Sequence, residues 1–226
     1  MLIISVALWM TGAGLAGFGQ SVEDMQKLHV LALTAASASV ERTNLIAEQD
    51  SLRPIFHVTA SSRFINDPNG PVYFAGEYHI FFQHLPFWGD SVHNKPVWGH
   101  AASKDMVHWY HLPIALAPIP GTYDSEAIAS GSCVIHNGVP TIIYTGVNPQ
   151  TQCLAMSYDS LRTWTKDPSN PVLSAPPSLE GMRDGFRDPF VWREGDKWRM
   201  LVGSGFQKTG RRVSPISACP LNGPRP

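Results

Sequence analysis

The sequence predicts an all-β protein of the β-propeller type, and three observations carry this prediction. From residue 52 onwards, aromatic and β-branched runs alternate with turn residues, which is typical of short strands. The chain holds 19 glycines and 19 prolines, enough for frequent turns. Hairpin-like segments and a Ser-x-Asp…Trp motif recur at a spacing of roughly 40–55 residues, which is typical of four-stranded propeller blades.

Residues 1–20 are apolar and rich in small residues, and they resemble a secretory signal with a weak cleavage site. They contain no Lys or Arg, and three glycines interrupt the apolar run, so a membrane span is not expected. We expect a secreted or periplasmic protein, with a cytoplasmic location as the alternative. Residues 21–50 are rich in Ala, Leu and Glu, and they predict a short helix or two outside the main fold.

Residues 51–210 are expected to form the propeller part of the chain. Three hairpins are predicted in it, and Asn137-Gly138 is the strongest turn signal among them. Their paired segments are residues 72–74 with 78–82, residues 132–135 with 141–144, and residues 190–192 with 198–202.

A corner motif follows each of the first two hairpins. Ser103-x-Asp105 precedes Trp109, and Ser157-x-Asp159 precedes Trp164. This repeat favours a propeller over the alternative, a β-sandwich. About two and a half blades are recognisable, and residues 211–226 lose strand alternation, so we expect an incomplete propeller with an irregular tail.

Composition narrows the classes of partner. The chain has 17 basic and 18 acidic side chains without a basic block, so a nucleic-acid partner is not expected. Three cysteines (Cys133, Cys153 and Cys219) are too few for a disulfide framework, and buried free thiols are expected. No spacing matches a metal site, so neither a metal nor a cofactor is expected.

Two Asp-Pro pairs are the strongest functional signal. Residues 63–70 read RFINDPNG and are expected to hold Asp67 in a rigid turn between apolar runs, since Pro68 restricts φ and Gly70 tolerates a positive φ. Asp188 precedes Pro189 in a matching context about 120 residues later. Two carboxylates that converge can act on a glycosidic bond.

Five motifs in this order resemble glycoside hydrolase family 32, the invertases, levanases, inulinases and related fructan enzymes. The resemblance covers about residues 53–205 and implies a five-bladed propeller with a funnel-shaped site. The motifs are Asn66-Asp67-Pro68-Asn69-Gly70, His79-x-x-Phe82-Gln83, Trp98-Gly99-His100, Ser130-Gly131-Ser132 and Arg187-Asp188-Pro189.

The resemblance implies retaining hydrolysis of terminal β-fructofuranosyl units in sucrose or fructans. Asp67 then matches the nucleophile, while Asp188 binds fructose hydroxyls and stabilises the transition state, assisted by Arg187. The implied sugar-binding residues are Asn66, Gln83 and Ser130, with Trp88 and Trp98 either stacking on sugar or lying in the core.

Other polar residues are weaker candidates. Asp124 lies near a position where the family often carries an Asp close to the sugar, and Asp184 is equally a loop residue. His84 and His100 are interpreted as structural histidines. Phe64-Ile65 replaces the family's Trp-Met and Ala129 replaces an aromatic residue, so both changes thin the aromatic wall.

The family's acid/base is a Glu in a Glu-Cys motif some fifty residues beyond Arg-Asp-Pro. No Glu follows Glu194 in this sequence, and Ala218-Cys219-Pro220 lacks the carboxylate. We therefore expect an N-terminal portion of a β-fructofuranosidase-like enzyme, truncated before that Glu. The alternatives are a fructosyltransferase and a catalytically inert sugar-binding fragment.

Overall fold

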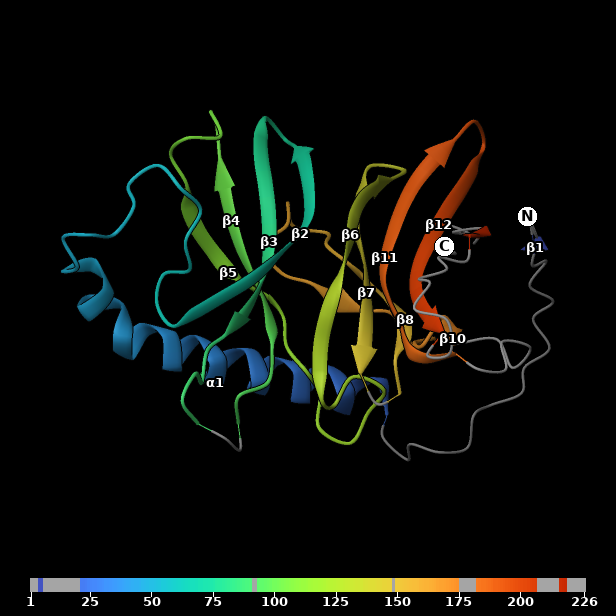
Figure 1. Ribbon diagram of the computed structural model, residues 1–226, viewed down its shortest axis with the longest axis horizontal. Coiled ribbons are helices and arrows are strands. Elements are labelled where there is room, and N and C mark those ends of the chain that lie inside the picture. Colours follow the sequence, from blue (N-terminus) through green and yellow to red (C-terminus); the bar gives the residue numbers. More distant parts are fainter. Residues whose placement is uncertain are drawn as a thin grey trace.

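The computed structural model describes residues 4–5, 21–90, 93–147, 149–174, 182–206 and 216–218. These residues form one long helix and three sheets, antiparallel except for the pairing of β1 with β13, that stand side by side as blades 1, 2 and 3 (Figure 1). The predicted fold class, an all-β protein of the propeller type, is confirmed.

Each blade has an innermost strand, β2, β6 or β11, from which the strands that follow in the chain continue outward, and blade 3 also includes β1 from the start of the chain. Blade 1 has the order β2-β3-β4-β5, and blade 2 has the order β6-β7-β8, with β9 and β10 both paired to β8. Blade 3 contains the long hairpin β11-β12, the short β13 and β1, which runs parallel to β13. The bounds are β1 Ile4–Ser5, β2 Phe64–Phe74, β3 Glu77–Leu85, β4 Val97–Ser103, β5 Tyr110–Leu116, β6 Ala127–His136, β7 Val139–Val147, β8 Thr151–Met156, β9 Thr165–Lys166, β10 Leu173–Ser174, β11 Met182–Glu194, β12 Lys197–Phe206 and β13 Ile216–Ala218.

All three predicted hairpins are confirmed as β2-β3, β6-β7 and β11-β12. At the second turn, Asn137 and Gly138 have φ of 48° and 80°, which is the left-handed pair that a two-residue hairpin turn requires. The predicted tail, residues 211–226, lies outside the described residues except for β13.

The repeated corner motif is built from side-chain turns. Ser103 Oγ donates to Asp105 Oδ1 (3.0 Å), and this carboxylate accepts the backbone N–H of His108 (2.8 Å). The second corner repeats the pattern, with Ser157 Oγ donating to Asp159 Oδ1 at 3.0 Å. The Ser and Asp therefore recur because each corner needs the same backbone donors satisfied before the outer strand begins.

The core lies in two layers on either side of blade 2. Successive residues of β7 point to opposite faces, so Ile142 packs with Phe81 and Trp98 of blade 1, whereas Ile143 packs with Phe186 of blade 3. Both isoleucines are at most 1% exposed. Burying such a side chain contributes about 1.5–3 kcal/mol to folding stability. These two side chains therefore help to hold blade 2 against both neighbouring blades.

Residues 22–48 form one helix, α1 (Val22–Glu48), rather than a short helix or two. The helix starts at a capping box between Ser21 and Asp24 and runs along one end of blades 1 and 2 (Figure 1). The expectation that it lies outside the main fold is wrong. Ser39 Oγ donates to the Pro86 carbonyl (2.7 Å) and Thr43 Oγ1 donates to Ser62 Oγ (2.8 Å).

Small side chains explain this packing, because Ala36 (1% exposed) and Ser39 allow a close approach to the blade. In the part of the chain that the structure describes, no helix carries an apolar stretch long enough to cross a bilayer. The predicted signal segment, residues 1–20, lies outside the described residues except for β1.

Candidate active site

Three bulged strands assemble the candidate site. The innermost strands β2, β6 and β11 are neighbours, with β6 between the other two. Each has a break in its pairing register: between Ile65 and Pro68 in β2, between Ala129 and Gly131 in β6, and between Arg187 and Phe190 in β11. Bulges turn side chains away from the regular alternation of a strand, and they occur next to active sites. Asp67, Ser130 and Asp188 each lie at one of these breaks.

Asp67 lies within β2 and not in a turn, which corrects the sequence prediction. Pro68 has no N–H to donate, and it borders the register break of β2, a kind of position at which a sheet tolerates proline. Gly70 has φ of 46° as expected, and a Cβ at this position would come within 2.8 Å of the Cys133 backbone nitrogen. Asp67 is therefore fixed by a bulge that packs closely on blade 2.

The carboxylate of Asp67 is exposed and hydrogen-bonded to the neighbouring blade. Ser130 Oγ donates to Asp67 Oδ2 at 3.0 Å, and Gln83 Nε2 donates to Ser130 Oγ at 3.2 Å. The structure therefore brings three predicted site residues from three strands into one chain of hydrogen bonds. Asn66 is exposed beside Asp67.

Asp188 lies at the bulge of β11 with φ of 61°, a left-handed conformation that is costly for a residue other than glycine. Its side chain is 49% exposed, and Arg187 Nε lies 3.4 Å from Asp188 Oδ2. Strained backbone of this kind is concentrated at functional sites, where the surrounding structure holds it in place.

The two carboxylates interact electrostatically. Burial raises the pKa of Asp188, the Arg187 guanidinium lowers it, and the negative charge of Asp67 raises it. Asp67 and Asp188 are therefore close enough for one charge to oppose the other. Asp67 of β2 and Asp188 of β11 lie on the two strands that flank β6.

The two tryptophan candidates have different environments. Trp88 is 50% exposed and stacks on Phe64 with ring centroids 4.4 Å apart and planes at 16°. Trp98 is 0% exposed, and its Nε1 donates to the Ala129 carbonyl at 3.0 Å. Trp98 therefore has no surface with which to contact a sugar, and its assignment as a substrate-binding residue is corrected to the core.

Asp124 is also a core residue rather than a site residue. It is 0% exposed, Lys166 Nζ donates to its Oδ2 at 2.5 Å, and Tyr144 donates its hydroxyl at 2.9 Å. Burial lowers the pKa of Lys166, and Asp124 opposes that shift. The side chain of Asp184 lies outside the described residues.

The histidine candidates are buried, in line with the structural interpretation. His84 Nε2 lies 2.9 Å from the Ser62 carbonyl, and His100 Nε2 lies 3.0 Å from His79 Nδ1. Burial, with His79 as a further cause, lowers the pKa of His100 to about 3. These imidazoles are neutral near pH 7.

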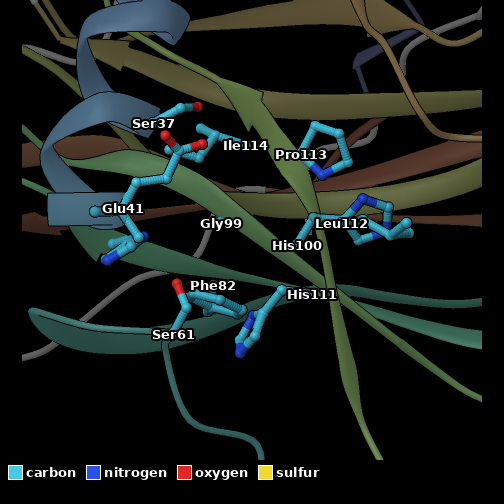
Figure 2. Close-up of a pocket in the computed structure, with 12 residues that line it drawn as sticks. Ser37, Glu41, Ser61, Phe82, Gly99, His100, His111, Leu112, Pro113 and Ile114 are labelled. Atoms are coloured by element: carbon cyan, nitrogen blue, oxygen red, sulfur yellow. The ribbon is translucent and has the colours of Figure 1, made fainter. Parts of the chain in front are cut away.

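A pocket of about 180 Å³ lies between α1 and blade 1 (Figure 2). Glu41 of the helix, Phe82 of β3 and His111 of β5 are among the residues that line it. Asp67 and Asp188 are not among them, so this pocket is distinct from the carboxylate site.

Cys133 and Cys153 are buried free thiols, as predicted, whereas Cys219 lies outside the described residues. Within the described residues, no three His, Cys, Asp or Glu side chains gather in a way that would hold a metal ion.

Sequence reasoning missed two residues that contact the site from blade 2. Thr145 Oγ1 accepts the Asp188 N–H at 3.0 Å, and Gln152 accepts from Thr145 at 2.8 Å. Gln152 precedes the apolar run Cys153–Met156 of its strand, and this is the local signal that could have marked it. Thr145 carries no such signal, because threonine is common in strands.

Comparisons with known proteins are consistent with this geometry. The family model described as "Glycosyl hydrolases family 32 N-terminal domain" matches residues 57–213. The chain is 41% identical over 172 residues to an acid beta-fructofuranosidase of Phaseolus vulgaris, covering 70% of this chain and 25% of that protein. It is 44% identical over 160 residues to a sucrose:sucrose 1-fructosyltransferase of Festuca arundinacea, covering 66% and 24%.

The fold is similar to that of a solved Bombyx mori GH32 beta-fructofuranosidase in complex with sucrose. The TM-score is 0.68 at 33% identity, covering 83% of this chain and 39% of that chain. The chain thus spans about a quarter of the length of the two curated relatives described above.

Proposed function

Because this chain belongs to glycoside hydrolase family 32, we propose that it carries the nucleophile part of a retaining β-fructofuranosidase site. The single observation that carries the proposal is that Asp67 and Asp188 lie at register breaks of β2 and β11, the two strands that flank β6, while Ser130 at the break of β6 donates to Asp67 Oδ2. The proposed substrates are terminal β-fructofuranosyl units of sucrose or fructans. Sucrose is the ligand in the Bombyx mori structure, and this supports the choice.

Asp67 is the proposed nucleophile. One Asp67 oxygen attacks the anomeric carbon of the fructosyl unit, and a covalent fructosyl ester forms as the bond to the leaving oxygen breaks. The leaving oxygen takes the bonding electron pair and receives its proton from water. Ser130 donates to Asp67 Oδ2 and orients the carboxylate for this attack. Water then hydrolyses the ester and regenerates Asp67.

Asp188 and Arg187 are the proposed fructose-binding pair. A carboxylate beside a developing positive charge stabilises an oxocarbenium-like transition state, and a guanidinium donates to sugar hydroxyls. Asn66 and Gln83 add amide groups to the same surface. The exposed Trp88, stacked on Phe64, offers a ring face to a sugar at the edge of the site.

The experiment separates nucleophilic attack from acid catalysis. The substrate is an aryl β-fructofuranoside that carries p-nitrophenol as its leaving group. This group departs as the phenolate, so cleavage needs little help from a general acid. We expect the 226-residue chain to release p-nitrophenolate and to carry one fructosyl unit on Asp67, which mass spectrometry detects. Asp67→Asn abolishes both signals, by roughly 10⁴-fold or more, as for other covalent nucleophiles.

The same assay tests the rival functions. An inert sugar-binding fragment would bind fructosides and release no phenolate. A fructosyltransferase, supported by the similarity to the Festuca arundinacea enzyme, would pass the fructosyl unit to added sucrose in preference to water. Chromatography of the products distinguishes free fructose from a trisaccharide.

Export is the proposed location, supported by the apolar, small-residue composition of residues 1–20. N-terminal sequencing of protein from the medium and from fractionated cells tests it. A cytoplasmic protein that retains Met1 would contradict the proposal.

A further inference from the structure

Side chains of blade 2 hydrogen-bond the backbone of β11 at both sides of Asp188. Gln150 Oε1 accepts the Phe186 N–H at 2.8 Å, and Gln152 Nε2 donates to the Phe186 carbonyl at 2.6 Å. Beyond Asp188, Ser132 Oγ donates to the Pro189 carbonyl at 2.7 Å and accepts the Val191 N–H at 3.2 Å. The segment that carries Asp188 is therefore held on blade 2 from both ends.

Thr145 connects this set to Asp188 itself. Its Oγ1 accepts the Asp188 N–H at 3.0 Å and donates its own hydrogen to Gln152 Oε1 at 2.8 Å. The Phe186 carbonyl fixes the Gln152 amide, because only the NH₂ end can donate to a carbonyl. The Gln152 oxygen then fixes the Thr145 hydrogen, which leaves a lone pair of Oγ1 for Asp188.

These groups are sealed from solvent, since Thr145 and Gln152 are both 0% exposed. The three hydrogen bonds therefore do not compete with water, and loss of one partner would leave a buried polar group unpaired. In contrast, the Asp188 side chain is about half exposed and lies beside Arg187.

The backbone of Asp188 needs such support. Its φ of 61° and the register break between Arg187 and Phe190 set it apart from regular strand. A non-glycine residue persists in this conformation only where neighbouring contacts over-determine it. The Thr145 hydroxyl contacts the N–H of the strained residue directly.

We propose that Thr145 and Gln152 are positioning residues, which hold the Asp188 backbone so that its carboxylate faces the fructosyl unit attacked by Asp67. The inference rests on the proposed function and adds two residues that do not touch substrate. It differs from a purely structural role, because it requires the Thr145 hydroxyl to matter for turnover beyond its effect on stability.

Thr141 supplies a matched control on the same strand, β7. It is also buried, at 7% exposed, and its Oγ1 donates to the Val139 carbonyl of β7 itself at 3.2 Å. Thr141→Val and Thr145→Val each remove one buried hydroxyl from β7. Only Thr145→Val removes the partner of the Asp188 N–H.

Turnover of the aryl fructoside is the first readout. Thr145→Val is expected to lower kcat by roughly 10²-fold, as for displacement of a catalytic group by about 1 Å, with a smaller change in KM. Thr145→Ser keeps the hydroxyl and restores most of kcat, while Thr141→Val leaves kcat near that of the unmodified chain. Equal losses in Thr145→Val and Thr141→Val, or no recovery in Thr145→Ser, would overturn the proposal.

Amide hydrogen exchange at Asp188 is the second readout, and it does not depend on activity. We expect the Asp188 amide to exchange faster in Thr145→Val than in Thr141→Val. We also expect faster exchange in Gln152→Met than in Thr141→Val, because Gln152→Met removes the group that orients Thr145. Equal exchange in all three overturns the positioning role. If the unmodified chain fails to cleave the fructoside while Asp188 exchange still depends on Thr145, the proposed function fails and the hydrogen-bonded arrangement stands.

Discussion

The two Asp-Pro sites of this protein share a sequence pattern but are held by different means. Both lie at bulges of innermost strands, Asp67 in β2 and Asp188 in β11. Asp67 is held through its carboxylate, which accepts a hydrogen bond from Ser130 of the adjacent blade. Asp188 is held through its backbone N–H, at a positive φ, by Thr145.

This difference matches the roles proposed for the two residues. A nucleophile needs one carboxylate oxygen oriented and the other available, and a single hydrogen bond from Ser130 satisfies this. A group that stabilises charge needs its whole position fixed, since it acts through space. Similar motifs in one chain therefore do not imply similar supports.

Removal of the Ser130 hydroxyl tests how Asp67 is held. Ser130→Ala is predicted to lower kcat/KM for the aryl fructoside by roughly 10- to 100-fold, equivalent to the loss of a hydrogen bond to a charged group. Steady-state kinetics with and without the substitution measure it.

The matched control is Thr163→Ala, because Thr163 Oγ1 also donates to an aspartate, Asp159 Oδ2, at 2.6 Å on an outer corner of blade 2. Thr163→Ala is expected to leave kcat/KM unchanged. Equal losses in the two variants would show that Ser130 acts only through stability.

The backbone strain at Asp188 predicts opposite signs for two glycine substitutions. Asp188→Gly relieves a left-handed conformation and is expected to raise the free energy of unfolding by about 1 kcal/mol, while it impairs turnover. Asp67→Gly places glycine in a strand with no such strain and lowers the free energy of unfolding by about 0.5–1 kcal/mol. Urea denaturation measures both free energies of unfolding. A lower value in Asp188→Gly would contradict backbone strain at Asp188.

The charge coupling gives the smallest and most specific effect. Arg187→Gln removes the guanidinium that lowers the pKa of Asp188, so that pKa rises further and the acid limb of the pH–rate profile moves to higher pH. Asp67→Asn removes a negative charge, so the pKa of Asp188 falls, which carboxyl-carbon NMR titration measures.

Arg193→Gln is the control for the pH profile. Arg193 lies on the same strand as Arg187, but its Nε donates to the Gly195 carbonyl at the far turn. An acid limb that moves equally in Arg187→Gln and Arg193→Gln would mean that net charge, and not the neighbouring guanidinium, sets the pKa of Asp188.

Local patterns predicted much of the fold. These patterns are the alternating apolar strands, the Asn137-Gly138 turn and the Ser-x-Asp corners. Each of them depends on residues that are close together in the sequence, so the sequence alone predicted them. The helix was predicted less well, because contacts such as Ser39 with Pro86 join distant segments. Trp98 was assigned to the site by motif and Asp124 was a weaker candidate, yet burial from neighbouring blades places both in the core.

The sequence by itself determined the order of strands, the hairpins and the two Asp-Pro motifs, because these depend on local backbone preference and on ordered motifs. Only the tertiary structure decided that Asp67, Ser130 and Asp188 meet at three adjacent bulges, and that Thr145 and Gln152 support one of them. The physical reason is that register breaks and hydrogen bonds between blades form only when strands that are distant in sequence pack together. The residues of a single strand do not reveal which strand of another blade packs against it.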